Sequence, residues 1–282
     1  SAASIAENSG STVTLTATLS IKVDEAVTVA LSTSGAATEG TDYGTISDIT
    51  VSAGATTGTA TFDPTDDSVY EDDEAATIAI DSVSGGGASE SGSQSVAVTI
   101  TENESEPTVT LTTSATSIAE NAGSSLTLTA TLSGATDQNV TVVLGTSGTS
   151  TEGTDYTDGS GNVDDITITA GSTTGTVSFT PTDDSIYEGN ETAIIAISSV
   201  TGEASESGTQ AVTITITDNE SAPTVTLTTS ATSIAENAGS SLTLTATLSG
   251  ATNADVTVAL STSGAATEGT DYTDGSGNID DI

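Results

Sequence analysis

Apolar and polar residues alternate along most of this chain, and the alternation is clearest in the segment 125–133. There Leu126, Leu128, Ala130 and Leu132 take every second position, with Thr between them. Successive side chains of a strand point to opposite faces, so a period of two places these four residues on one face. The segment is therefore predicted to be a half-buried β-strand.

The same alternation returns in shorter segments on both sides of this strand. They are 109–111, 140–144, 166–168, 176–179, 193–197 and 212–216. Gly, Ser, Asn and Asp fill the gaps as turn formers, and no segment has a helical period. About seven short strands in roughly a hundred residues are typical of an immunoglobulin-like sandwich. We therefore predict an all-β fold of antiparallel immunoglobulin-like β-sandwiches.

The chain also repeats itself. The sequence that begins at Pro107 recurs from Pro223. An earlier copy matches the same sequence from Ile5 onward. Repetition at domain length predicts an array of modules. The expected domains are 1–106 (first strand missing), 107–222 (complete) and 223–282 (truncated), here called the first, second and third copies. Because the chain lacks an initial Met and stops inside a copy at Ile282, we expect it to be a segment of a longer protein.

Charge limits the possible partners. The chain has 40 Asp and Glu against one Lys or Arg, which gives a formal net charge of −39. Such self-repulsion destabilises a compact state unless cations neutralise it. Nucleic acids and anionic membranes attract basic patches, so we exclude both as partners. No long apolar run is present, and we expect no membrane insertion.

The acidic residues recur at four fixed places: Ala-Glu-Asn, Gly-Thr-Asp-Tyr, Asp-Asp-Ser-x-Tyr-Glu-x-x-Glu, and the end of the last strand. In the second copy these are Glu120, Asp155, Asp183, Asp184, Glu188, Glu191, Asp218 and Glu220. Loops at one end of a sandwich converge, and carboxylates gathered there repel and raise one another's pKa. Calcium takes 6–8 oxygen ligands and removes that conflict. With no Cys and no His, zinc and most transition metals lose their preferred ligands.

The four elements, in this order, resemble the Calx-β domain, a family found in sodium–calcium exchangers and in long bacterial surface and matrix proteins. The resemblance implies a seven-stranded sandwich with a calcium cluster at the end facing the next domain. By that resemblance the ligands of the second copy are Glu120, Asp155, Asp183, Asp184, Glu188 and Glu191, with the backbone carbonyl of Ile186. In the first copy they are Glu7, Asp42, Asp66, Asp67, Glu71 and Glu74, and in the third copy Glu236 and Asp271. The terminal acidic run, Glu102 in the first copy and Asp218 with Glu220 in the second, is weaker than in the family, which leaves the number of ions open.

A simpler interpretation of acidic residues is a solvated surface, and we assign Glu39, Glu90, Glu203 and Glu206 to it. Catalysis finds no support, because His and Cys are absent and no Ser stands beside a plausible base. Paired carboxylates could serve glycoside hydrolysis, but the aromatic platforms common in sugar sites are missing. We do not expect an enzyme.

The sequence thus predicts an extracellular or cell-surface array of calcium-stiffened modules, part of a long adhesin, matrix protein or surface filament. Its expected partners are calcium ions and copies of itself. The alternatives are a calcium-sensing regulatory module and the stalk of a secreted hydrolase. Near-identical copies favour the array, because a sensor needs only one or two tuned sites.

Overall fold

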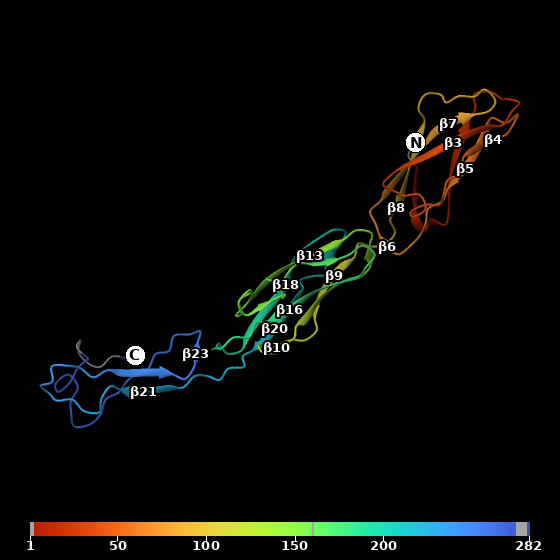
Figure 1. The fold of residues 1–282 in the computed structure, drawn as a ribbon. Helices are drawn as coiled ribbons and strands as arrows, with labels where there is room; N and C mark the ends of the chain where they lie inside the picture. The colour runs from red at the N-terminus through yellow and green to blue at the C-terminus, as the bar shows by residue number, and fades with distance from the viewer. Residues whose placement is uncertain (1–2, 160, 275–280) are drawn as a thin grey trace.

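A computed structural model describes residues 3–159, 161–274 and 281–282. Figure 1 shows three bodies of strands following one another along an extended line. The predicted all-β fold class is confirmed. In the described part of the chain the one helical segment is the three-residue 3-10 helix η1, Glu7–Ser9, so no helix there is long enough to cross a bilayer.

The second copy is a sandwich of two five-stranded sheets, ordered β10-β20-β18-β13-β15 and β14-β16-β11-β9-β19. Its strands are β9 (Thr108–Thr113), β10 (Ser117–Ala119), β11 (Leu126–Leu132), β12 (Ala135–Thr136), β13 (Val140–Gly148), β14 (Tyr156–Thr157), β15 (Ile166–Ile168), β16 (Thr174–Pro181), β17 (Ile186–Tyr187), β18 (Glu191–Thr201), β19 (Ser205–Glu206) and β20 (Ala211–Thr217). Each of the seven segments predicted from alternation overlaps a strand; these strands are β9, β11, β13, β15, β16, β18 and β20. The inward side chains meet between the sheets, where Leu128, Phe179 and Ile195 have no exposed surface.

Strand β10 is the main element that the alternation did not reveal; of its three residues, Ile118 is the buried one. It continues from β9 but joins the other sheet, where it pairs in parallel with β20. Strand β9 pairs antiparallel with β11 and in parallel with β19. The antiparallel arrangement expected from the sequence therefore holds for the inner pairs, and the sheet edges add parallel ones.

The first copy has the same plan with fewer strands, and the counterpart of β9 is among those missing from its described residues. Its strands are β1 (Ala3–Ala6), β2 (Val13–Thr18), β3 (Val27–Gly35), β4 (Ile49–Val51), β5 (Thr57–Phe62), β6 (Val69–Tyr70), β7 (Glu74–Ser84) and β8 (Ser95–Thr101). One sheet has the order β1-β8-β7-β3-β4, and the other consists of β2 and β5. Among the described residues no strand covers β2 as β9 covers β11.

The third copy contains β21 (Val225–Thr229), β22 (Leu244–Leu248) and β23 (Ala251–Thr252). Strands β21 and β22 form a two-stranded sheet, and the described residues of this copy provide no sheet that faces it. Apolar side chains that point inward in the second copy are open here, and Leu227 is 52% exposed.

Strands also pair across the joints between copies. Strand β6 of the first copy pairs in parallel with β12 of the second, so that Thr136 lies opposite Tyr70. Strand β17 of the second copy pairs in the same way with β23 of the third, with Thr252 opposite Tyr187. Consecutive copies are therefore held by backbone pairing as well as by the connecting chain.

Candidate metal centres

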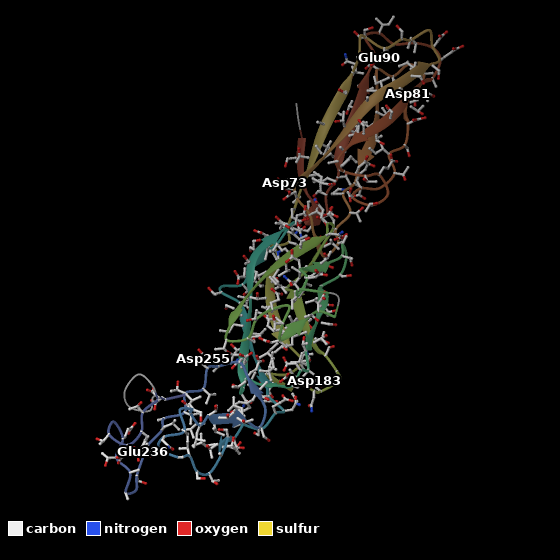
Figure 2. The ribbon with its side chains drawn as sticks, turned by 60° about the vertical axis from the view of Figure 1, so that its left-hand side comes forward. Asp73, Asp81, Glu90, Asp183, Glu236 and Asp255 are labelled. Carbon is white, nitrogen blue, oxygen red and sulfur yellow. The ribbon has the colours of Figure 1, made fainter. Side chains whose placement is uncertain are left out.

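The acidic loops of the first two copies gather at the end that faces the following copy. Figure 2 shows Asp73 where the first copy meets the second, and Asp183 and Asp255 where the second meets the third. Asp81 and Glu90 lie at the opposite end of the first copy. The predicted convergence of loops thus coincides with the joints.

Local structure explains how two of the acids are placed. Tyr156 is 1% exposed and stacks on Phe179 with ring centroids 4.6 Å apart, which anchors the neighbouring Asp155. Asp155 Oδ2 in turn accepts the backbone N–H of Thr151 at 2.5 Å. Tyr43 and Phe62 repeat the stack in the first copy, also at 4.6 Å.

Close packing of backbones places the glutamates that begin β7 and β18. Gly148 lies against the backbone just after Glu191, and a Cβ atom on it would come 2.1 Å from the carbonyl oxygen of Thr192. Its φ of +124° also favours glycine. Gly35 has the same relation to Ala75 in the first copy. These glycines allow the loop carrying Asp42 or Asp155 to approach Glu74 or Glu191.

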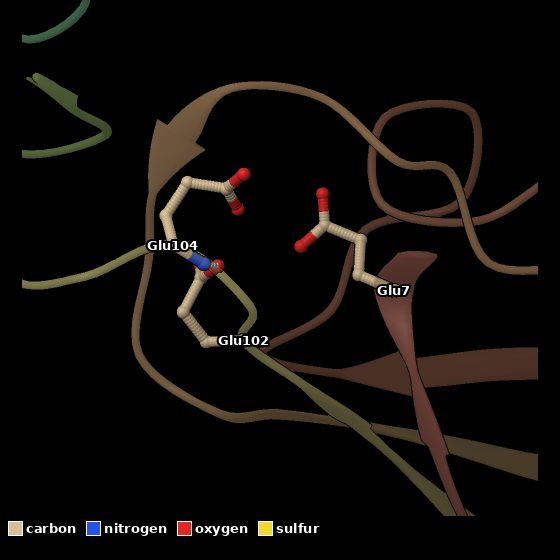
Figure 3. A group of neighbouring side chains, drawn as sticks. All are labelled: Glu7, Glu102 and Glu104. Atoms are coloured by element: carbon tan, nitrogen blue, oxygen red, sulfur yellow. Dashed lines mark hydrogen bonds between the residues drawn. The ribbon is translucent and has the colours of Figure 1, made fainter. Parts of the chain in front are cut away.

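In each of the first two copies the acids form two groups whose carboxylate oxygens lie within 4.8 Å of one another. The groups of the first copy are Glu7, Glu102, Glu104 and Asp42, Glu71, Glu74; those of the second are Glu120, Asp218, Glu220 and Asp155, Glu188, Glu191. Figure 3 shows Glu7, Glu102 and Glu104 with their carboxylates turned toward a common space.

Backbone amides lower the pKa of one carboxylate in each of the first two copies. Glu102 accepts the N–H groups of Glu71 and Glu104, each at 2.7 Å. Burial alone would raise the pKa of Glu102, but these hydrogen bonds bring it below the ordinary value. Asp218 has a lowered pKa for the same reason, because it accepts the N–H groups of Glu188 and Glu220 at 2.7 Å.

The glutamates of these groups other than Glu102 have raised pKa values. Burial, followed by the charge of Asp42, raises the pKa of Glu71 and of Glu74 to about 7. Burial and Asp155 do the same to Glu191. Negative charge in these groups is therefore crowded and poorly compensated in the absence of a cation.

Several features fit a cation at these groups. Oε2 of Glu104 and Oε2 of Glu220 are buried, and no hydrogen-bond donor among the described residues reaches either atom. A cavity of about 10 Å³ in the first copy has room for about one small ion or water molecule. It is lined by Glu7, Thr41, Asp42, Thr65, Asp67, Glu71, Asp72, Glu74, Ile100 and Glu102, with no Lys, Arg or His. Such an all-oxygen donor set suits a hard divalent ion.

Some of the predicted ligands lie outside the four groups. Asp67 lines the cavity, and Asp67 and Asp184 each cap a strand by accepting the N–H of Val69 and Ile186, at 2.7 and 2.6 Å. Asp66 and Asp183 lie close enough to raise the pKa of Glu104 and Glu220. Ile186 belongs to β17, which pairs with the third copy.

The third copy shows only part of the arrangement. Asp271 Oδ2 accepts the N–H of Thr267 at 2.7 Å, the same turn that holds Asp155. Glu236 is exposed, and neither residue belongs to a described group of three acids.

The sequence analysis did not include Glu104 among the candidate ligands, although it included the equivalent Glu220. The tripeptide Asn-Glu-Ser, repeated in both copies, was the signal that could have identified it. Glu39, Glu90, Glu203 and Glu206, which the sequence assigns to a solvated surface, are half-buried, and none of them belongs to a described group of three acids. Glu39, Glu90 and Glu206 accept backbone N–H groups of their own loops. Glu203 lies beside the joint, where burial and a hydrogen bond with Asp137 raise its pKa to about 7.

Comparison with known proteins gives a consistent family. The Calx-beta domain matches residues 1–104, 102–220 and 218–280. Among solved structures, CBD12 from CALX1.2 is 15% identical with a TM-score of 0.34, over 76% of this chain and 96% of that chain. The Yersinia pseudotuberculosis adhesin InvE is 16% identical with a TM-score of 0.35, over 76% of this chain and 56% of that chain. A search of curated proteins gives no match. From the three family matches, which together span nearly the whole sequence, we conclude that the chain belongs to the Calx-beta domain family.

Proposed function

We propose that this chain is a structural array of calcium-binding modules, with joints near residues 106 and 222, that calcium ions stiffen at each joint. The observation that carries the proposal is the position of the paired carboxylate groups. In both of the first two copies they lie at the end where the next copy docks by strand pairing.

Calcium is the ion that best fits the donor set. Each of the first two copies offers six carboxylates in two neighbouring groups, and Asp66 and Asp67, or Asp183 and Asp184, stand beside them. Calcium accepts many oxygen ligands in flexible geometry, whereas magnesium demands a near-ideal octahedron and retains water. Two or more ions per copy, bridged by shared carboxylates, would neutralise the crowding that raises the pKa values.

The ions and the joint are connected through the backbone. Glu71 directly follows β6 and Glu188 directly follows β17, the two strands that pair with the next copy. An ion that holds either glutamate also fixes the edge on which the next copy docks. Without an ion, repulsion among the carboxylates loosens the loop and the joint with it.

This arrangement supports a mechanical role outside the cell, where millimolar calcium suits weak extracellular calcium modules. The array would serve as a spacer in a long adhesin, matrix protein or surface filament, with no catalytic activity. Copies of the same chain are the expected macromolecular partner.

Calcium titration of the whole chain by calorimetry tests the proposal, together with small-angle X-ray scattering. We expect heat of binding from more than one ion, and an elongated, narrow scattering profile in calcium that broadens in chelator below the melting temperature. Absence of calcium binding would contradict the proposal, and a profile indifferent to calcium would remove the stiffening role.

A further inference from the structure

The chain has one Asp-Pro peptide bond, between Asp63 and Pro64 in the first copy. It directly follows β5, whose last residue, Phe62, has no exposed surface. The second copy has Thr180 and Pro181 at the equivalent positions. The two copies therefore present the same place in the fold with and without a carboxyl group before the proline.

The backbone on both sides of this bond is held by the loop between β3 and β4. The N–H of Gly44 donates to the carbonyl oxygen of Asp63 at 2.9 Å. The N–H of Thr65 donates to the carbonyl oxygen of Asp42, also at 2.9 Å. In the sequence Pro64 lies between these two hydrogen bonds. The Asp63–Pro64 bond is thus fixed in position although it lies at the surface.

The side chain of Asp63 is exposed, and no hydrogen bond among the described residues engages its carboxylate. Gly44 has no side chain to cover it, and a Cβ atom built there would come no closer than 3.9 Å to the Asp63 carbonyl oxygen. In the second copy Thr157 stands opposite Thr180, whose hydroxyl is bonded to that of Ser125 at 2.7 Å. The carboxylate of Asp63 is therefore free to turn toward its own carbonyl carbon, and solvent reaches the bond.

An aspartate before proline has a route to cleavage of its own peptide bond. A carboxylate oxygen of Asp63 attacks the Asp63 carbonyl carbon and closes a small cyclic anhydride. The C–N bond to Pro64 breaks, and the proline nitrogen leaves as an amine after it takes a proton from solvent. Water then opens the anhydride, which restores the side-chain carboxyl and leaves a new terminal carboxyl on Asp63. Because proline has no N–H, its nitrogen cannot instead attack the side chain to form a succinimide.

The fold supplies a donor at the atom where charge develops in this reaction. During the attack the carbonyl oxygen of Asp63 becomes negatively charged, and the N–H of Gly44 donates to it in the folded chain. Loss of one such donor costs a factor of about a hundred or more in a closed active site, and we expect about tenfold at this exposed bond. The folded chain should therefore cleave faster than the unfolded one.

We propose that Asp63 cleaves its own peptide bond to Pro64, which makes the first copy a break point in the array. The cut separates β1 to β5 from β6 to β8. Strands β1 and β3 still pair with β8 and β7, so the two fragments stay associated while the first copy is folded. The reaction occurs once in each chain, acts on no other substrate and requires no bound ion.

Incubation of the full chain in mildly acidic buffer tests the proposal, because the leaving nitrogen needs a proton. At about pH 4.5, near the ordinary pKa of a carboxyl group, intact-mass spectrometry should show fragments 1–63 and 64–282 appearing together. The rate should be about tenfold higher in the folded chain than in urea, with circular dichroism to verify each state. A rate in urea equal to the folded rate, or higher, would overturn the proposal.

Two substitutions identify the nucleophile. Asp63→Asn removes the carboxylate and should abolish both fragments. Asp63→Glu keeps the charge but must close a larger ring, so the folded chain should be cleaved about tenfold more slowly. Undiminished cleavage in Asp63→Asn would mean that Asp63 is not the nucleophile.

Gly44→Pro removes the N–H that donates to Asp63, and Gly44→Ala retains it as the matched control. Gly44→Pro should lower the folded rate to the rate in urea, and Gly44→Ala should leave it unchanged. Cleavage of folded Gly44→Pro at the wild-type rate would show that this donor has no role, and the proposal would fail.

Thr180→Asp tests the same place in the second copy, so the proposal does not depend on the folding of a Gly44 variant. The frame is the same, because the N–H of Thr182 donates to the carbonyl oxygen of Asp155 at 2.9 Å. We expect a second cut that releases fragment 181–282, again faster in the folded chain than in urea. Absence of this cut would contradict the role assigned to the fold.

Discussion

The first and second copies carry nearly the same strands, yet the same strand is buried to different extents. Leu15 and Leu128 occupy equivalent positions in β2 and β11. Leu128 has no exposed surface, because β11 lies between β16 and β9. Leu15 is 7% exposed where β2 pairs with β5 alone, and the third equivalent, Leu244, is 37% exposed. Local sequence selects the strand, and its neighbours determine how much stability it contributes.

The acidic ends of the two copies also differ, but here the first copy is the more crowded one. The backbone frame is the same, since Glu7 and Glu120 accept the N–H groups of Asp67 and Asp184 at 2.8 and 2.9 Å. The first copy, however, places additional acids around that frame. The copy with the less complete core thus carries the more crowded site, and it should depend more on calcium.

Removal of calcium should have the largest effect on stability, and it should destabilise the first copy more than the second. An ion that binds only the folded state adds about 4 kcal/mol at a thousandfold excess over its Kd. In chelator we expect a lower melting temperature by calorimetry, and a greater loss of amide protection in β2, β5 and β7 than in β11, β16 and β18. Equal losses in the two copies would contradict the comparison.

Truncation of the equivalent leucines tests the difference in the cores. Leu128→Ala should cost about 2–5 kcal/mol, the usual range for a fully buried leucine. Leu15→Ala should cost less, and Leu244→Ala least of all. Hydrogen exchange of each copy in calcium measures the three effects within one chain. A cost for Leu244→Ala equal to that of Leu128→Ala would show that exposure does not rank these sites.

Neutralisation of a single acid should have a smaller effect. Asp184→Asn keeps an acceptor for the N–H of Ile186 but removes a charge beside Glu120. We expect about tenfold weaker calcium binding in the second copy, or about 1.4 kcal/mol. Asp67→Asn should weaken the first copy similarly. Asp81→Asn is the control, and an equal effect of all three in a calcium titration would indicate diffuse charge rather than sites.

The pH dependence should be the smallest effect, because these carboxyl groups are partly open to solvent. Glu71, Glu74 and Glu191 have pKa values near 7 in the folded chain, above the ordinary 4.5. The folded state then binds more protons between these values, so stability in chelator should fall as pH rises from about 4.5 to 7.

Calcium competes with those protons, so its affinity should rise over the same pH interval. Thermal melts at several pH values, with and without chelator, measure both trends. A melting temperature in chelator that rises steadily from pH 4.5 to 7 would contradict the assigned crowding.

The alternation of apolar residues was sufficient to locate strands such as β11 and β15, because side-chain direction in a strand has a period of two whatever the partner. The recurring acidic motifs likewise identified Glu120, Asp155 and Glu191 as chemically important. Crowded carboxylates with almost no Lys or Arg beside them need a cation. These conclusions depend on local order and composition alone.

The partners of each side chain depend on sheet register and on docking between copies. Strand β10 changes sheets after β9 because its pairing with β20 is decided by residues about a hundred positions away. Glu7 meets Asp67 across 60 residues, and Glu102 meets Glu71 across 31. Glu203 reads as a surface acid in the sequence, yet it lies against Asp137 at a joint. Only the tertiary structure brings such residues together, because electrostatic contact acts through space and the sequence pattern contains no such distances.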